Sequence, residues 1–507
     1  MVSKLMKRYL LIFAVMLAAL GSCKRNGLES GIPAGFDKYC TNAFDQWHIP
    51  AMAAVVVKDG EVVYLKGFGI TKQDSTGVPV DPVNTQFVLA STTKAFTATL
   101  LANVIDEYDV NWEDPVIKHL PDFRMYDPWV TENMMVGEVN SHHNGWKEYA
   151  MDDLPFFGYD RDGLYDLFSA IKPSYGFRTK YAYNNEMYTV SAKIIEKYTG
   201  QSWDDAMADR IFRPLGMVHS TTGTKAYRTS KDLAYGYRVQ YNADRDSLYL
   251  EPRDDRDDAF TWLSAVAPAA FVMTTASDLA NYIRMHLDHG VFEGDTIVSR
   301  ENHDYLFKPQ SVSGFGDDLI RTYGQGWGVE QKDARYRYIR HTGLAYGYTS
   351  LVGLVPELDL GFAFICTNGT TSNPLEALGK KLIDMYLGID GPDYAAESLD
   401  SFKESRRKKS DEEAEPDSSA CSLPLSAYTG VYHQDQFGDA FVSMEDGTLH
   451  FKLKSVDSAL RHVSGDTFSF HVDGAGHFDL NFEVKGSRAE SLTFDIGDPI
   501  SPLVRVR

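Results

Sequence analysis

The alternation of apolar and polar positions predicts two kinds of structure along this chain. Residues 51–70, AMAAVVVKDGEVVYLKGFGI, contain two β-rich runs around Lys58-Asp59-Gly60, a strong turn signal, and so predict a hairpin. Near residue 340 three more β-like runs follow one another, and the helical periodicity of EALGKKLIDMYLGI comes after them. Helical and irregular stretches alternate between these regions. We therefore expect one α/β (α+β) domain over residues 35–392, in which helices cover an antiparallel sheet.

The pattern changes after residue 392. Residues 393–422 have few large apolar side chains and carry a basic block followed by an acidic one, which predicts a solvated linker with some helical content. In residues 423–507, short β-rich runs such as YTGVYH and LHFKL alternate with Gly, Asp and Ser turns. This spacing is typical of a small all-β domain of barrel-like form.

Residues 1–22 resemble a bacterial export signal of the lipoprotein type. The basic start MVSKLMKR is followed by the apolar run YLLIFAVMLAAL, which is too short to span a membrane comfortably. Leu20-Gly21-Ser22-Cys23 is similar to a lipobox, so we expect Cys23 to become the lipidated N-terminus and residues 23–34 to be a tether. The alternative is an ordinary secretory leader cut nearby. We expect the lipid on Cys23 to be the only membrane anchor, and to hold the chain at the periplasmic side of a membrane or at the cell envelope.

Composition and charge narrow the range of partners. The formal charge is −21, which speaks against nucleic acid because phosphate binding needs clustered cations. Cys40, Cys366 and Cys421 are too few for a disulfide framework in a chain of this size, and at most one bridge can form among them. No group of His, Cys, Asp and Glu has metal-ligand spacing, so we expect neither a metal nor another cofactor.

The stretch FVLASTTKAFTATLL, residues 87–101, places Ser91 three residues before Lys94 where a strand-like run meets an amphipathic helix. On a helix these two side chains share a face, so the ammonium group can reach the hydroxyl. A serine needs a neighbouring base to be a nucleophile, and a buried lysine is such a base when desolvation lowers its pKa. The helix N-terminus also favours an oxyanion. The alternative is that Ser91 only caps the helix and Lys94 is solvated.

The S-x-x-K spacing alone is weak evidence because it occurs three times. Ser169-Lys172 is followed by Pro173, which argues against a continuing helix, and Ser405-Lys408 lies in the predicted linker. Only the first tetrad stands at the end of a strand-like run with an amphipathic helix behind it.

Two further elements turn the first tetrad into a specific signal. Serine hydrolases that use S-x-x-K need a second hydroxyl group and a strand edge with a cation or donor before a glycine. Tyr183-Asn184-Asn185 directly precedes a helical pattern, and His341-Thr342-Gly343 lies between two predicted strands. His143-Asn144-Gly145 also fits H-x-G, but we interpret His142 and His143 as structural. All three motifs, in this order and on suitable elements, predict a serine hydrolase.

With these motifs the chain resembles the serine β-lactamase and penicillin-binding-protein-like hydrolases, in particular the branch of class C β-lactamases and D-Ala-D-Ala carboxypeptidases. The resemblance covers about residues 35–390 and includes IFRPLGM and APAAFVMTTASDLANYI. The C-terminal region resembles the lipocalin-like β-domain of some members, including D-amino-acid-specific peptidases. Substrate binding, capping of the active site and oligomerisation are all open roles for that domain.

The resemblance implies catalytic roles for four residues. Ser91 would be the acylated nucleophile and Lys94 its base or proton relay. Tyr183 would share the proton with Lys94 and pass it to the leaving group. His341 stands where the lactamases carry a lysine.

It also implies a set of substrate-binding residues. Asn185 would bind the substrate amide, and Gly343 would let the substrate approach the strand, next to Thr342. The backbone N–H groups of Ser91 and Leu344 would form the oxyanion hole, and one such donor is worth on the order of 3 kcal/mol in barrier.

The histidine in the third motif bears on which class of substrate the site can bind. A histidine with an ordinary pKa of about 6.5 is mostly neutral at pH 7, whereas a lysine would hold a substrate carboxylate. We therefore expect an exported serine hydrolase of amide or ester bonds in small molecules or peptides, with D-amino-acid-containing peptides or esters as substrates. The alternatives are a true β-lactamase and a binding or sensor module without turnover.

Overall fold

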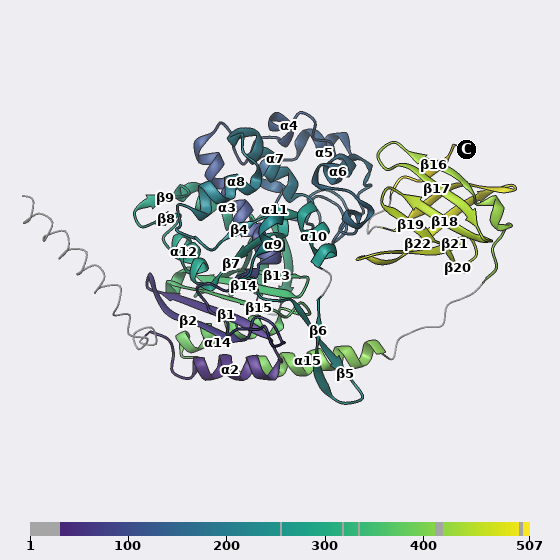
Figure 1. Ribbon diagram of the computed structural model, residues 1–507. Coiled ribbons are helices and arrows are strands. Elements are labelled where there is room, and N and C mark those ends of the chain that lie inside the picture. Colours follow the sequence, from purple (N-terminus) through teal and green to yellow (C-terminus); the bar gives the residue numbers. More distant parts are fainter. Residues whose placement is uncertain are drawn as a thin grey trace, which may run out of the picture.

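The structure is a computed structural model that describes residues 31–253, 256–316, 319–332, 335–410, 419–495 and 500–506. These residues form a larger domain with a central sheet and a smaller all-β domain beside it (Figure 1). The expected signal peptide and the lipidation site Cys23 lie outside the described residues. Within them, every helix is too short or too polar to cross a membrane.

The larger domain is built around an antiparallel sheet of eight strands. From edge to edge the strands are β10 (Ser311–Gly316), β11 (Leu319–Tyr323), β12 (Gly328–Lys332), β13 (Tyr336–Ala345), β14 (Tyr348–Val355), β15 (Leu360–Cys366), β1 (Ala51–Lys58) and β2 (Glu61–Gly69). The predicted hairpin is β1–β2, and its turn residues Asp59 (φ 53°) and Gly60 (φ 76°) are both left-handed, as a tight hairpin requires.

Helices cover both faces of this sheet, which explains why β14 and β15 are buried along their whole length. One face is covered by α2 (Phe36–Gln46), α14 (Asn373–Leu387) and α15 (Tyr394–Ser410). The other face carries a larger helical layer with α3 (Thr93–Glu107) at its centre, where the Phe96 ring stacks on Tyr282 with centroids 3.8 Å apart. The candidate site lies between this layer and the sheet.

The remaining elements of the helical layer are short. Its helices besides α3 are α4 (Val116–His119), α5 (Pro128–Asn133), α6 (Arg161–Asp166), α7 (Tyr188–Thr199), α8 (Trp203–Met207), α9 (Thr224–Thr229), α10 (Arg256–Ala265), α11 (Ala267–Ala270), α12 (Ala276–Leu287) and α13 (Arg300–Leu306). Its strands are β3 (Phe87–Val88), β4 (Thr221–Thr222), β7 (Val272–Thr274), β8 (Val291–Phe292) and β9 (Asp295–Thr296). The hairpin of β5 (Tyr237–Asn242) and β6 (Ser247–Pro252) instead lies beside α15.

The first part of the predicted linker is a helix packed on the larger domain. α15 occupies residues 394–410, and its Phe402 ring lies 5.4 Å from the Trp47 ring of the segment after α2. Trp47 Nε1 also donates a hydrogen bond to the Ala395 carbonyl (3.1 Å). The composition of this segment is polar because only a narrow stripe of apolar residues is needed to hold a surface helix.

The smaller domain is a curved antiparallel sheet of nine strands. In spatial order they are β19 (Val456–Ala459), β18 (Thr448–Leu453), β17 (Gly438–Glu445), β16 (Gly430–Gln434), β24 (Leu503–Arg505), β23 (Arg488–Phe494), β22 (Gly476–Lys485), β21 (Thr467–Val472) and β20 (Arg461–Ser464). The His471 backbone N–H donates to Ser458 Oγ (3.1 Å), which links β21 to β19 and nearly closes a barrel. The predicted fold class is thus confirmed for both domains.

Candidate active site

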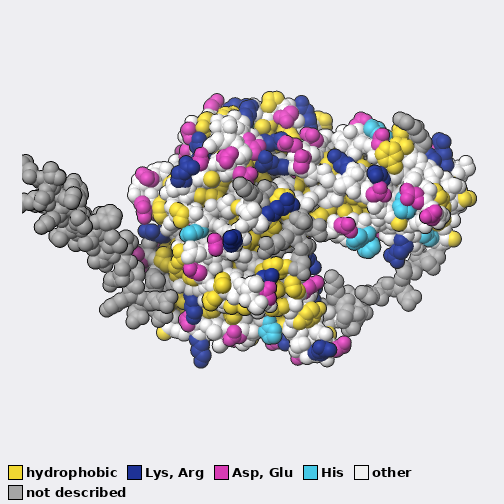
Figure 2. All heavy atoms as spheres, viewed as in Figure 1, with side chains coloured by type: hydrophobic (Ala, Val, Ile, Leu, Met, Phe, Trp, Pro, Cys, Tyr) yellow, Lys and Arg dark blue, Asp and Glu magenta, His cyan; other side chains and the backbone are white. Residues whose placement is uncertain are grey.

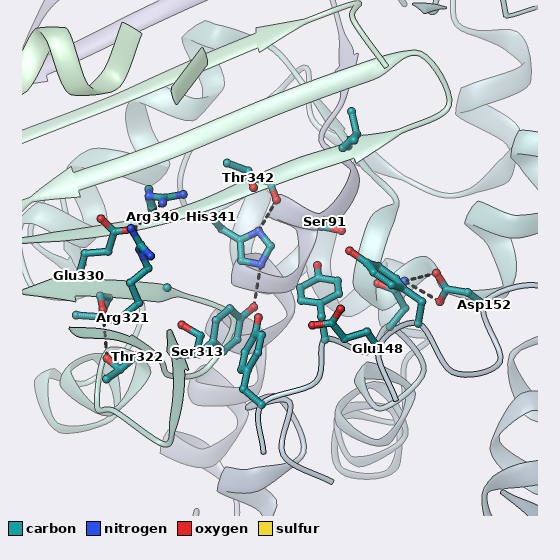
Figure 3. A pocket seen from close by; sticks show the side chains of 18 of the residues that line it. Ser91, Glu148, Asp152, Ser313, Arg321, Thr322, Glu330, Arg340, His341 and Thr342 are labelled. Carbon is teal, nitrogen blue, oxygen red and sulfur yellow. Dashed lines mark hydrogen bonds and ion pairs between the residues drawn. The ribbon is translucent and has the colours of Figure 1, made fainter. Parts of the chain in front are cut away.

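The three sequence motifs meet in one cleft of about 480 Å³ (Figure 3). Ser91 comes from the helical layer, Tyr183 from the irregular segment before α7, and His341 from strand β13 of the central sheet. Thr342 and Leu344, from the same strand, line the cleft as well. These motifs are separated by up to 250 residues in the chain, so only the fold brings them together.

Ser91 stands in a strained turn rather than in a helix cap. The preceding residue, Ala90, has φ 48°, a left-handed conformation that residues with a Cβ rarely adopt. Ser91 is the middle residue of the 3₁₀-helix Ala90–Thr92, and no side chain caps either this helix or α3 behind it. The Ser91 side chain is therefore free of a capping role and faces the cleft.

The turn that carries Ser91 is pinned to the central sheet. Ser350 Oγ on β14 donates to the Leu89 carbonyl (2.5 Å) and shares a hydrogen bond of 2.8 Å with Thr92 Oγ1. A side chain at Gly343 would collide with the same Leu89 carbonyl. The resemblance implied that Gly343 gives the substrate access to the strand, but in the structure the glycine lets the Ser91 turn pack against β13.

Lys94 is fully buried beneath Ser91 and holds a fixed position. Its Nζ donates to Ser91 Oγ at 3.3 Å, to Asn185 Oδ1 at 2.5 Å and to the Ala269 carbonyl at 3.1 Å. The Nζ atom also lies 4.7 Å from the centre of the Tyr183 ring. Lys94 is thus not a solvated lysine, because its amine is enclosed by the residues that the motifs predicted.

The environment of Lys94 brings its pKa into the range of a general base. Burial lowers the pKa of Lys94 to about 7, although the nearby carboxyl groups of Asp152 and Glu186 act to raise it. Near neutral pH a substantial fraction of Lys94 is therefore the free amine, which can accept the proton of Ser91.

Asp152 and Glu186 form a buried carboxyl pair behind the site, and the sequence motifs did not reveal either of them. Asn185 Nδ2 donates to both carboxylate oxygens of Asp152, at 2.8 and 3.0 Å (Figure 3). Burial raises the pKa of Asp152 to about 6, while that of Glu186 is raised well above its usual value by burial and by Asp152. Burial and the neighbouring Asp152 thus favour the neutral form of Glu186, and Asp152 is the larger of the two carboxyl influences on Lys94.

Asn185 connects this pair to the base. Its side-chain oxygen accepts from Lys94 and its side-chain nitrogen donates to Asp152. The resemblance implied that Asn185 binds the substrate amide. In the structure, both ends of the Asn185 side chain are already engaged by the protein, and its first role is to orient Lys94.

Tyr183 lies in the cleft wall with its phenol protonated. Burial raises the pKa of Tyr183 well above its usual value, and a hydrogen bond with Ser91 opposes this only in part. The His142 ring packs against Tyr183 with centroids 4.4 Å apart, and His142 Nδ1 accepts from the Asn184 backbone N–H (3.1 Å). His142 thus supports Tyr183 from behind, in line with the structural role predicted for it.

His341 is held as a neutral imidazole. Its Nδ1 donates to the Thr342 carbonyl (2.6 Å), so its Nε2 is left to accept a hydrogen bond from the Tyr323 hydroxyl (2.8 Å; Figure 3). Burial lowers the pKa of His341 to about 3, and the positive charges of Lys94 and Arg340 add to the effect. The cleft therefore has no cation at the position of the third motif near pH 7.

Two arginines lie at the end of the cleft beyond His341. Arg321 on β11 pairs with Glu330 (3.2 Å), and Arg340 pairs with Glu330 and with Glu376, both at 2.6 Å. No sequence motif indicates this cluster, since Arg321, Glu330 and Arg340 meet through the pairing of β11, β12 and β13, and Glu376 comes from α14. Signals for the missed carboxylates existed: Glu186 directly follows Tyr183-Asn184-Asn185, and Asp152 stands in an apolar stretch.

The other sequence candidates lie outside the cleft. Ser169 belongs to the 3₁₀-helix Leu167–Ala170, Ser405 to α15, and His143 lines a separate groove. None of the three is among the residues that line the cleft.

The cysteines and the potential metal ligands are likewise not among the residues that line the cleft. Cys40, Cys366 and Cys421 are free thiols, and burial raises the pKa of Cys366 to about 12. In the part of the chain that the structure describes, one group could supply three metal ligands. It consists of His289, just after α12, and of His303 and Asp304 within α13.

Comparison with known protein families finds a matching family model for each domain. The family model described as Beta-lactamase matches residues 36–385, and a model described as a domain of unknown function (DUF3471) matches residues 414–501.

Similar proteins include an unguisins hydrolase, ungD', of Aspergillus campestris, which is 29% identical over 381 residues that cover 71% of this chain and 67% of that protein. Penicillin-binding protein 4 of Amycolatopsis lactamdurans is 28% identical over 362 residues, or 69% of this chain and 89% of that one.

A solved structure resembles both domains together. The octameric penicillin-binding protein homologue from Pyrococcus abyssi aligns over 91% of this chain and 98% of that chain, with a TM-score of 0.57 and 20% identity. This likeness concerns the fold. The family model, in contrast, covers well over half of the sequence, so the predicted family and the prediction of a hydrolase are confirmed. The chain belongs to the β-lactamase family.

Proposed function

We propose that this hydrolase acts through an acyl-enzyme on Ser91, with Lys94 as the general base. One observation carries the proposal: the amine of Lys94, buried and with a pKa of about 7, lies 3.3 Å from Ser91 Oγ at the wall of an open cleft. A lysine that is kept partly unprotonated next to a serine is costly, and a merely structural lysine gains nothing from it.

Acylation then runs as follows. Ser91 Oγ attacks the carbonyl carbon of the substrate while its proton moves to the Lys94 amine. The carbonyl oxygen becomes an oxyanion, for which the backbone N–H groups of Ser91 and Leu344 are the proposed donors. Tyr183 gives its phenolic proton to the leaving nitrogen or oxygen as that bond breaks, and takes the proton held by Lys94. The leaving group departs as a neutral amine or alcohol, and Ser91 carries the acyl group.

Deacylation uses the same groups in reverse. Water attacks the acyl carbon and gives a proton to Lys94, directly or through Tyr183. As the bond between Ser91 Oγ and the acyl carbon breaks, Oγ takes this proton and the carboxylic acid product leaves. The Lys94 amine and the Ser91 hydroxyl are thereby restored.

We propose amide or ester bonds as the target, in peptides or esters that contain D-amino acids. This class is supported by the resemblance of the larger domain to the D-Ala-D-Ala carboxypeptidase branch and of the C-terminal domain to the β-domain of some D-amino-acid-specific peptidases. The neutral state of His341 supports it against β-lactams, because the third motif then supplies no cation that could hold their carboxylate. A true β-lactamase is the alternative within the family, and a sensor that is acylated without turnover is the alternative outside enzymes.

A substrate panel tests the proposal. Purified protein and the Ser91→Ala variant are compared on D-amino-acid amides, D-peptides, simple esters and a chromogenic cephalosporin. We expect wild type to turn over an amide or ester, and the variant to lose about 10³-fold or more of that activity. A variant that keeps the activity contradicts the role of Ser91. Efficient hydrolysis of the cephalosporin identifies a β-lactamase, and an adduct that never leaves identifies a sensor.

We also propose that the protein is an exported lipoprotein anchored through Cys23. The support is the sequence of residues 1–23 alone, a basic start, a short apolar run and a lipobox-like end. Labelled palmitate should be incorporated into the full-length protein in a bacterial host and should be lost in Cys23→Ala. Incorporation that survives this substitution contradicts the proposal.

A further inference from the structure

A phenylalanine of the catalytic domain lies inside the core of the C-terminal β-domain. Phe157 ends the 3₁₀-helix Leu154–Phe157 and is fully buried. Its ring centre lies 5.3 Å from that of Phe478, 5.6 Å from that of Phe494 and 6.1 Å from that of Phe470. These three rings come from strands β22, β23 and β21, so Phe157 completes the core of a domain to which it does not belong in sequence.

Hydrogen bonds fix the segment around Phe157 in place. The Ser455 backbone N–H donates to the Phe157 carbonyl (3.2 Å), and the Tyr159 hydroxyl donates to the Phe437 carbonyl (3.3 Å). Gly158 has φ +91°, and Ser455 Oγ lies 2.9 Å from the place of a Cβ there, so only glycine fits. The two domains therefore meet through a specific joint, on the side where Figure 2 shows them in direct contact.

The same segment leads directly into the active site. Asp152, five residues before Phe157, accepts the hydrogen bonds of Asn185 Nδ2, and Asn185 in turn accepts from Lys94. The backbone carbonyl of Asp152 accepts from Trp262 Nε1 (2.9 Å). We call residues 148–153 the Asp152 loop.

The Asp152 loop has little regular structure of its own. Tyr149 and Met151 both have positive φ (59° and 68°), and the internal backbone hydrogen bonds of this region are short-range turns such as Asp152 N–H to the Tyr149 carbonyl (3.2 Å). Turns of this kind open easily unless tertiary contacts hold them. Met151 within the loop and Leu154 just after it are fully buried, and Phe157 is the fully buried side chain of this segment whose ring packs among those of the β-domain.

We infer that the C-terminal β-domain is a clamp that holds the Asp152 loop in the active site, and that Phe157 is the positioning residue through which it acts. The interior of the β-domain thus holds the Asp152 loop in place through Phe157. It does not bind a ligand at that position. The inference goes beyond the proposed function, but its first readout rests on it, because that readout is the reactivity of Ser91.

The test uses the full chain and a fluorophosphonate probe, whose rate of reaction with Ser91 is measured as a function of pH. Phe157→Ala removes the clamp, and Phe157→Leu keeps most of its apolar volume. Phe468→Ala is the matched control, since Phe468 is buried in the same domain but packs on Tyr428 and Phe482, with ring centres 5.3 and 5.7 Å away.

We expect Phe157→Ala to lower the labelling rate at pH 8 about tenfold, because small misplacements near reacting groups are costly, and Phe157→Leu and Phe468→Ala to stay within about twofold. Phe157→Ala should also move the acid limb of the profile to lower pH, because Asp152 no longer supports the charged form of Lys94. If Phe157→Ala changes neither the labelling rate nor the pH of the acid limb, the inference is overturned. Equal effects of Phe468→Ala overturn it as well, since they would reflect general destabilisation.

Hydrogen–deuterium exchange separates this inference from the proposed function. Phe157→Ala should speed the exchange of backbone amides in residues 148–153, and Phe468→Ala should not. If the wild-type protein is not labelled at all, the proposed role of Ser91 fails, and exchange alone decides: faster exchange confined to Phe157→Ala supports the clamp, and its absence refutes it.

Discussion

The two basic side chains on either side of Ser91 differ in how the fold treats their charge. Lys94 is fully buried but has two carboxyl groups nearby, and its pKa stays at about 7. His341 is buried as well, has no carboxylate among the groups that shift its pKa, and is lowered to about 3. Lys94 can therefore exchange a proton near neutral pH, whereas His341 stays neutral and only donates and accepts hydrogen bonds.

The difference shows that burial alone does not decide the role of a basic residue. Desolvation lowers the pKa of both groups, and the neighbouring charges set the final pKa of each group. Asp152 supplies the negative charge at the Lys94 end, and Lys94 itself supplies positive charge at the His341 end. The Lys94 amine is thus suited to move protons, and the neutral His341 imidazole to contact a polar but uncharged part of a substrate.

The largest effect should come from removing the base. Lys94→Met keeps the length of the side chain without the amine, and we expect kcat/KM on the best ester or amide to fall about 10³-fold, the usual worth of a general base. The comparison requires that the variant is folded, as judged by circular dichroism and thermal unfolding. Retention of more than a tenth of the activity in a folded variant would mean that another group takes the Ser91 proton.

A charge at the opposite end should change the substrate preference. For His341→Lys we expect the ratio of kcat/KM for a cephalosporin to that for a neutral ester to rise about tenfold, because an ammonium group pairs with the β-lactam carboxylate. His341→Gln, which stays neutral, is the matched control. If both variants shift the ratio equally, charge at this position does not select the substrate.

The carboxyl pair should set the pH dependence. Asp152→Asn removes the negative charge that favours protonated Lys94, so the pKa of Lys94 falls and the amine persists to lower pH. We expect the acid limb of kcat/KM to move down by about one pH unit. Glu186→Gln should move the limb less, because burial and Asp152 favour the neutral form of Glu186 and Asp152 has the larger effect on the pKa of Lys94. A shift to higher pH, or an equal shift in both variants, would contradict this distribution of charge.

The smallest effect should come from the partner of His341. Tyr323→Phe leaves the His341 Nε2 atom buried without its donor, and we expect a loss of about 1 kcal/mol in unfolding free energy, measured in urea. Activity should stay within about threefold, since Tyr323 does not touch the reacting bond. A loss comparable to that of Lys94→Met would instead place Tyr323 in the proton path.

Much of the site could be read from single residues at fixed spacing. Ser91 and Lys94 are one helical turn apart, so local geometry already brings them together. Tyr183 and His341 were recognised because each lies at the junction or edge that the chemistry requires. Gly343 was recognised too, but for a different reason, since the close approach to Leu89 depends on a neighbouring segment far away in the chain.

The residues that were missed act through the fold and not through a motif. Asp152 and Glu186 influence Lys94 because α7 and the Asp152 loop converge behind it, and Tyr323 meets His341 only across the sheet. Phe157 gives no sequence signal at all, because its partners belong to another domain. Such contacts depend on register and packing, which hydrophobic periodicity does not specify.

By itself, the sequence determined the family and the fold class, and it predicted the domain bounds and Ser91 with Lys94 as nucleophile and base. These depend on periodicity and on residues a few positions apart, and both are local properties of a chain. Only the tertiary structure decided in which direction the pKa values of Lys94, His341 and Glu186 are shifted, and that Phe157 packs inside the β-domain. A pKa depends on burial and on every charge within a few ångströms, and those neighbours are chosen by the folded chain.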